Sequence, residues 1–133
     1  MDQDGIVMPK QVTKTPNAPQ PIGLYSQGIV AGGFLFVSAQ GAMDPGTGQI
    51  AGTDIESQTR RTLTNVRNIV EASGFSMRDL VRVSIFLKNM KDFKKMNEVY
   101  KSFILDPPPA RTTVQAELPN PEMLIAIDAI AVR

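Results

Sequence analysis

Cysteine and histidine are both absent from the sequence. Without thiols and imidazoles, the chain cannot use a cysteine nucleophile, a Ser-His-Asp triad or a histidine acid–base pair, and most zinc and iron sites lose their usual ligands. Neither of the glycine-rich motifs GxGxxG and GxxxxGK[ST] occurs, so a phosphate-cradling nucleotide site has no support. Any chemistry must therefore rest on arginine, lysine, carboxylates, hydroxyl groups, the backbone and water.

Long runs of one kind of residue are also missing. The net charge is +1, and no run of lysine or arginine exceeds two residues, so nucleic acid is not the expected partner. No apolar stretch is long enough to span a bilayer, and the acidic start at residues 1–4 is unlike a signal or transit peptide. We expect a cytoplasmic protein that has no membrane partner.

With 133 residues, of which 42% are hydrophobic and 20% charged, the chain has the composition of a globular protein with its own core. We expect a single domain over residues 1–133. Residues 1–16 predict an extended N-terminal arm, with one short strand near residues 10–15.

The first half of the chain predicts a hairpin followed by a helix. Residues 27–30 and 34–40 form two strands joined by the glycine-containing loop at 31–33, and a turn cluster follows at residues 43–48. In the second strand, Ser38 shares one face with two phenylalanines. A T-x-x-E capping box at Thr53 predicts the helix start, and Gly74 marks its end.

The second half predicts a strand at residues 80–87 and a second helix capped by Asn89 or nearby. Phe93, Met96, Tyr100, Phe103 and Ile104 form the apolar stripe of this helix, which ends at Asp106 and Pro107. The pattern favours Asn97 as a surface amide and Tyr100 as a tyrosine at the edge of the core.

Three prolines at residues 107–109 end that helix and begin an extended segment, because proline donates no hydrogen bond and biases the preceding residue away from the helical region. From Arg111 onward the side chains alternate, which predicts a core face and a polar face. The polar face carries Arg111, Thr113, Gln115 and Glu117, and the other carries Thr112, Val114, Ala116 and Leu118. A guanidinium on such a rigid strand suits a planar carboxylate; the alternative is an edge-strand arginine in a surface ion pair.

The last strand, residues 124–132, is apolar on both faces except at Asp128. It therefore needs cover on both sides, yet two helices can cover only one face of such a sheet. We infer an α+β domain of order β-β-α-β-α-β-β, with a mixed sheet, both helices on one face, and another subunit covering the second face.

In order and spacing, several motifs together resemble the RidA/YjgF family of reactive intermediate deaminases. The matching stretches cover nearly the whole chain, at residues 17–19, 22–28, 37–41, 63–66, 97–103, 109–111 and 128–133. The resemblance implies a chorismate-mutase-like fold, a homotrimer and clefts between neighbouring subunits.

The activity implied by the resemblance is hydrolysis of 2-iminobutanoate, 2-iminopropanoate and similar enamine/imine products of pyridoxal-phosphate enzymes. The products are 2-keto acids and ammonium, and no cofactor or metal is required. By match, Arg111 binds the substrate carboxylate, while Tyr25, Ser38 and the backbone at Thr113 line the pocket. The candidate catalytic residues are Arg111 and Thr113, and the candidate substrate-binding residues are Tyr25, Ser38, Arg111, Glu117 and Asp128.

The sequence departs from the family pattern at Ala126, where the resemblance implies a glutamate that helps to hold the attacking water. Asp128 shares the strand face of Ala126 but lies roughly 6.6 Å along the strand, too far for the identical role. Glu117 shares the face of Arg111 and is either a replacement acid or a rim charge. Whether Asp128, Glu117 or a backbone carbonyl replaces the glutamate stays open. A second hypothesis is a non-catalytic, regulatory trimer that binds small carboxylates or 2-keto acids. A third is the endoribonuclease activity attached to relatives, against which stand the missing histidine and the lack of a basic aromatic surface.

Overall fold

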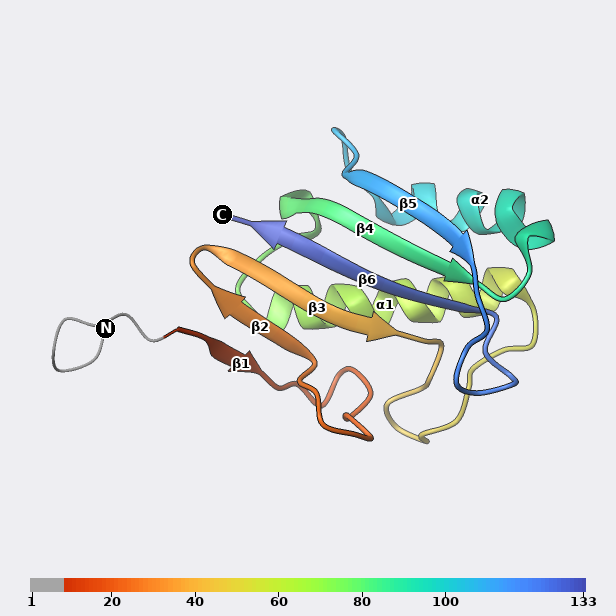
Figure 1. Cartoon of the computed structure of the whole chain (residues 1–133), viewed down its shortest axis with the longest axis horizontal. Helices are drawn as coiled ribbons and strands as arrows, with labels where there is room; N and C mark the ends of the chain where they lie inside the picture. Colours follow the sequence, from red (N-terminus) through yellow and green to blue (C-terminus); the bar gives the residue numbers. More distant parts are fainter. Residues whose placement is uncertain (1–8) are drawn as a thin grey trace, which may run out of the picture.

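The computed structural model describes residues 9–133, which form one mixed sheet and two α-helices (Figure 1). The strands are β1 (Gln11–Thr13), β2 (Gly28–Ala31), β3 (Phe34–Gln40), β4 (Leu80–Leu87), β5 (Ala110–Gln115) and β6 (Ile125–Val132). The helices are α1 (Ile55–Ala72) and α2 (Phe93–Phe103), with short 3-10 turns at Met77–Asp79 and Met90–Asp92. The short strand expected near residues 10–15 is confirmed as β1; residues 1–8 of the predicted arm lie outside the described residues.

The strand order in the sheet is β1-β2-β3-β6-β4-β5. All neighbouring pairs are antiparallel except β4 and β5, which run parallel. The last strand thus lies in the middle of the sheet, and the strand that carries Arg111 forms an edge. This order could not be read from the sequence, because it depends on pairings between distant segments.

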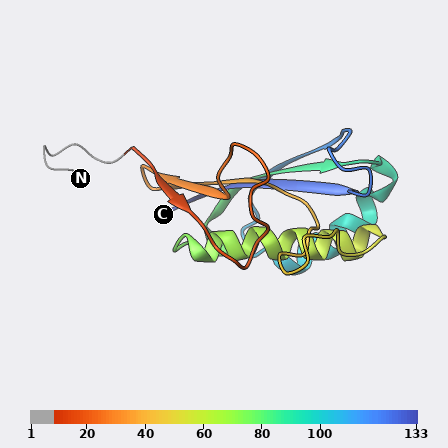
Figure 2. The same cartoon turned by 90° about the horizontal axis from the view of Figure 1, so that it is seen from below.

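Both helices lie on the same side of the sheet (Figure 2), so the predicted α+β architecture is confirmed. The core between the two layers consists of apolar side chains from the helix-facing side of the central strands and from α1 and α2. It includes Leu35, Val37, Val83, Ile85, Leu87, Ile127, Ala129, Leu63, Ile69 and Met96, all buried. Neither helix is long and apolar enough to cross a membrane within the described part of the chain.

The start of α1 differs from the expected capping box. Asp54, not Thr53, is the N-cap, and its Oδ1 accepts hydrogen bonds from the backbone N–H and the hydroxyl of Ser57, both at 2.7 Å. These bonds stabilise the ionised carboxylate and lower the pKa of Asp54. The predicted end is confirmed, since Gly74 has a positive φ of 83° just beyond the helix.

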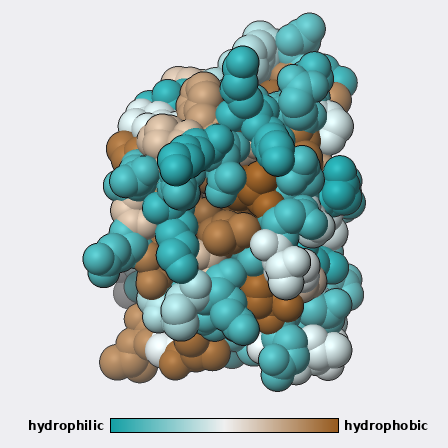
Figure 3. All heavy atoms as spheres, turned by 90° about the vertical axis from the view of Figure 1, so that its right-hand side faces the viewer, coloured by the Kyte–Doolittle hydropathy of each residue, from teal (hydrophilic) through white to brown (hydrophobic). Residues whose placement is uncertain are grey.

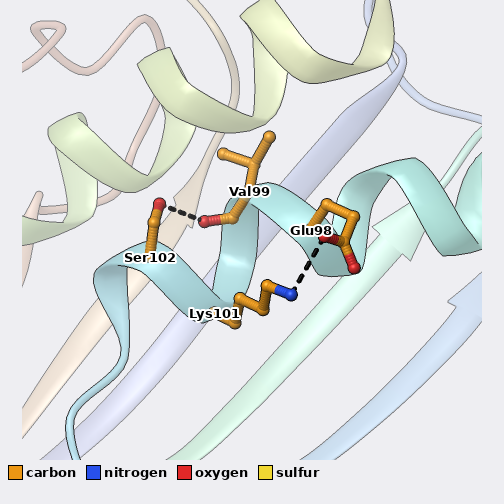
Figure 4. A network of polar contacts seen from close by, with 4 residues as sticks. All are labelled: Glu98, Val99, Lys101 and Ser102. Carbon is orange, nitrogen blue, oxygen red and sulfur yellow. Dashed lines mark hydrogen bonds and ion pairs between the residues drawn. The ribbon is translucent and has the colours of Figure 1, made fainter.

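Both faces of α2 are defined by its contacts. Lys101 Nζ lies 3.0 Å from Glu98 Oε1, and the hydroxyl of Ser102 donates to the carbonyl of Val99 at 2.6 Å (Figure 4). This ion pair is well exposed and adds little to stability. Met96 and Tyr100 lie on the buried side, so this side of α2 faces the core.

The sheet face away from the helices has no second layer within the described chain. Phe34, Phe36 and Val114 are 42%, 45% and 40% exposed there, and the two phenylalanine rings stack at a centroid separation of 6.1 Å. Three large apolar side chains left open on one face are typical of an interaction surface.

Candidate functional site

Arg111 is the second residue of β5 and pairs in parallel register with Val83 of β4. Because Val83 is buried on the helix-facing side, Arg111 also points toward the helices. Its Nη1 donates to Asn97 Oδ1 at 2.8 Å. Its Cζ lies 4.7 Å from the Tyr100 ring centroid and 5.7 Å from that of Phe93. The guanidinium is thus held by three side chains of α2.

The expected division of β5 into a core face and a polar face is therefore wrong. Arg111 and Thr113 lie on the helix side and are half-buried, while Thr112 and Val114 are exposed on the open face. At the edge of the sheet, an arginine can be partly buried because the aromatic rings of α2 attract its positive charge. The binary pattern of the strand could not reveal this arrangement.

Tyr100 lies at the edge of the core as predicted, with 7% of its surface exposed. Asn97 differs from its predicted role as a surface amide, because it is half-buried and accepts a hydrogen bond from Arg111. Both contact Arg111 directly. Their spacing of three residues on one helix was visible in the sequence, but the sequence did not indicate that β5 lies beside them.

Two buried hydroxyl groups near Arg111 have no hydrogen-bond partner among the described residues: the Tyr100 OH and Thr113 Oγ1. Both oxygens are enclosed by the chain, so a ligand or water cannot reach them without movement of the surrounding side chains. Burial raises the pKa of Tyr100, and the charge of Arg111 partly opposes this rise. Tyr100 is therefore a neutral hydroxyl at pH 7. The Arg111 guanidinium beside it can bind an anionic, oxygen-rich group.

Tyr25 and Ser38 lie in a different part of the molecule. Ser38 Oγ donates to the carbonyl of Ser26 at 2.5 Å, and the Tyr25 hydroxyl accepts a bond from the Ile22 N–H at 3.4 Å. The segment is anchored by Gln27, which is 2% exposed. The Gln27 side chain accepts from the N–H of Thr15 at 2.7 Å and donates to the carbonyl of Pro19 at 2.9 Å.

A cavity of about 530 Å³ opens beside Tyr25. It is formed by the segment before β2, the end of β3, the loop before β6 and Ala126. Near the end of β3, the register with β6 shifts between Val37 and Gln40, so Gln40 rather than Ala39 is buried. Such a bulge redirects side chains at the end of a strand. Tyr25 and Ala126 thus line one cavity.

The structure does not bring Arg111 to Tyr25 or Ser38 within one chain. Two strands, β6 and β4, lie between β3 and β5, which places Ser38 and Arg111 roughly 14 Å apart across the sheet. Each chain therefore carries two separate half-sites, one around Arg111 and one around Tyr25.

Glu117 and Asp128 are also separated from Arg111. β5 ends at Gln115, and six extended residues span roughly 20 Å, so Glu117 lies well away, beside Lys88 in an open hollow. Asp128 pairs with Ser84, which pairs with Thr112. Asp128 therefore lies on the open face, whereas Arg111 lies on the helix face. Neither carboxylate reaches Arg111 in the same chain, and their site roles stay predictions.

The architecture defines the class: α+β proteins with two helices packed on one face of a six-stranded mixed sheet. A family model described as "Endoribonuclease L-PSP" matches residues 15–133, almost the entire chain. The protein belongs to this family, which is also known as RidA/YjgF.

Relatives and solved structures agree with this assignment. The chain is 48% identical over 122 residues to a RutC family protein of Pyrococcus horikoshii, covering 92% of this chain and 97% of that protein. It is 42% identical over 125 residues to the 2-iminobutanoate/2-iminopropanoate deaminase of Dermatophagoides farinae, covering 93% and 97%. The crystal structure of Escherichia coli TdcF with bound serine matches with a TM-score of 0.87 at 38% identity, covering 93% of this chain and 99% of that one.

Proposed function

We propose that the protein is a cytoplasmic imine/enamine deaminase that converts 2-imino acids, such as 2-iminobutanoate and 2-iminopropanoate, to 2-keto acids and ammonium. The observation that carries the proposal is the Arg111 guanidinium, held by Asn97, Tyr100 and Phe93 on α2. Support comes also from relatives with deaminase names and from the serine bound to TdcF, an amino acid of comparable size.

The carboxylate of the substrate pairs with Arg111. A bidentate guanidinium–carboxylate pair fixes both the position and the plane of a small ligand, and each charge-assisted bond contributes roughly 1.5–3 kcal/mol. A water oxygen then adds to the carbon of the C=N bond and gives a tetrahedral carbinolamine. Loss of ammonia from that carbon leaves the 2-keto acid. Because the imine is intrinsically reactive, positioning of the substrate and the water supplies much of the rate.

The active assembly that we propose is a homotrimer whose clefts lie between subunits. The separation of the Arg111 half-site from the Tyr25 half-site within one chain supports this assembly, since a neighbouring chain can bring the two together. The exposed phenylalanines of the open face give such an oligomer an apolar contact surface.

The test is an assay in which an amino-acid oxidase or a serine dehydratase generates the imine and its decay is followed. We expect wild-type protein to accelerate the decay and Arg111→Ala to abolish the acceleration while the oligomer stays intact. Arg111→Lys, which keeps the charge but loses the planar pair of donors, should retain only a small part of the rate. Arg60→Ala, on the exposed side of α1, is the matched control. Equal rates for Arg111→Ala and wild type would refute the proposal.

A second candidate function follows from Ala126, which has no proton acceptor to hold the attacking water. In this alternative the protein is a regulatory trimer that binds 2-keto acids or other small carboxylates without turnover. It predicts saturable binding that depends on Arg111, with no acceleration for any imine. Hydrolysis well above the free-solution rate would eliminate it.

A further inference from the structure

The cavity beside Tyr25 is lined mostly by apolar side chains, and Gln20, Gln40 and Asn120 are its polar lining residues besides Tyr25. Its lining includes Ile22, Met43, Ile50, Met123 and Ala126, and none of its lining residues is a lysine, arginine, aspartate or glutamate. Its volume of about 530 Å³ falls within the range of roughly 300–1,000 Å³ typical of pockets that enclose drug-sized ligands. A three- or four-carbon imino acid would leave much of that space unfilled.

The molecule presents this cavity at the end where the loops before β6 and after β3 gather. Seen from that end, hydrophobic atoms lie in a recess between hydrophilic side chains (Figure 3). An apolar recess with a polar border is suited to an apolar group on a ligand whose other end is polar.

Ala126 keeps one wall of the cavity small and uncharged. It is the second residue of β6, is 6% exposed and pairs with Phe86 of β4. A larger or ionised side chain at this position would occupy part of the cavity and would place polar atoms among apolar ones, which is unfavourable.

Gly41 and Met123 form an adaptable part of the lining. A Cβ atom on Gly41 would lie 2.6 Å from the Met123 Cε, so the missing side chain is what lets the methionine pack against the backbone there. Methionine is unbranched and polarisable, and it adjusts to ligands of irregular shape. This contact gives the cavity a wall that can follow a branched or an aromatic group.

We propose that this cavity binds the side chain of the 2-imino acid, and that the preferred substrates are imines of large apolar amino acids such as leucine and phenylalanine. The inference rests on the proposed function, in which a neighbouring chain supplies Arg111 for the carboxylate. The class of reaction that supplies such a substrate is the two-electron oxidation of an apolar amino acid across its Cα–N bond by an oxidase or dehydrogenase, which releases a free imine.

Two measurements test the inference. The first compares kcat/KM for imines that an amino-acid oxidase generates from leucine, phenylalanine and alanine. The second measures by calorimetry the Kd of pyruvate and of 4-methyl-2-oxopentanoate, the products that correspond to alanine and leucine. We expect the larger ligand to be favoured at least about tenfold in both measurements, since one methylene in an apolar pocket already discriminates by roughly 10–200-fold.

Ala126→Glu should reduce the preference for the leucine-derived ligand at least about tenfold, whereas Ala72→Glu, an exposed site at the end of α1, should leave it unchanged. Should Ala126→Glu fail to fold, Met123→Ser in the loop before β6 provides the same comparison.

The two proposals fail in different ways. No acceleration for any imine refutes the deaminase, while the Kd ratio still tests the cavity. The inference is overturned if kcat/KM for the alanine-derived imine equals or exceeds that for the leucine-derived imine, or if pyruvate binds as tightly as 4-methyl-2-oxopentanoate. It is also overturned if neither keto acid binds.

Discussion

The guanidinium carbon of Arg111 lies 4.7 Å from the centroid of the Tyr100 ring, so the proposed carboxylate anchor rests on an aromatic face contributed by α2. Asn97, one turn earlier on the same helix, accepts the hydrogen bond from Nη1. The helix therefore controls where the remaining N–H groups of Arg111 point, and this control has measurable consequences.

Replacing the Tyr100 ring should weaken substrate binding without removing the guanidinium. A cation–π contact contributes about 0.5–2 kcal/mol, so Tyr100→Leu should raise KM by roughly 2- to 30-fold. Tyr100→Phe keeps the ring and should retain most of the wild-type KM. Steady-state kinetics of both variants, with thermal unfolding as the control for stability, distinguish the roles of ring and hydroxyl. Equal effects of the two substitutions would assign the role to the hydroxyl.

The hydroxyl of Tyr100 should titrate at a higher pH than an ordinary tyrosine. Burial raises its pKa in the folded state above the ordinary tyrosine value of about 10. The stability linked to the neutral hydroxyl is therefore fully present below about pH 10 and is lost as the pH rises through the folded-state pKa. Tyr25→Phe leaves Tyr100 as the only tyrosine, so ultraviolet titration of the folded and denatured variant measures the shift. Adding Arg111→Ala should raise the pKa of Tyr100 further.

Gln27 should be important for stability. Its buried amide pairs with the backbone N–H of Thr15 and with three carbonyl groups in the same segment. Gln27→Leu leaves these groups without a partner, and each buried unpaired group costs about 1–3 kcal/mol. We expect the free energy of unfolding to fall by at least about 2 kcal/mol. Urea unfolding measures this loss, and Gln49→Leu, at an exposed position, is the control; a midpoint unchanged from wild type would contradict the expectation.

The open face of the sheet should hold the oligomer together. Phe36 is 45% exposed and stacks on Phe34, so Phe36→Asp places a charge in the proposed contact surface, where its desolvation is unfavourable. Analytical ultracentrifugation should show the trimer of the wild type converted to smaller species. Met90→Asp, also at an exposed hydrophobic residue but in the turn before α2, should leave the mass unchanged. A monomeric wild-type protein would refute the proposed assembly.

Much of the fold could be predicted from local patterns. The strand at Phe34–Gln40, the strand at Leu80–Leu87 and the left-handed Gly74 all lie where the sequence placed them. These features depend on residues within one or two turns of each other, because hydrophobic period and backbone freedom are local properties. The expectation of Thr53 as N-cap was wrong, because the neighbouring Asp54 can also cap a helix and only the geometry of the preceding loop selects one.

For the candidate site, the residue type and chain position of Arg111 indicated a carboxylate anchor, and those are properties of the sequence alone. The tertiary structure decided what surrounds it. The parallel pairing of β5 with β4 turned Arg111 toward α2, and the central position of β6 separated it from Tyr25 and Ser38. Strand order depends on contacts between segments far apart in the chain, and the alternation within one strand does not say which strand lies beside it.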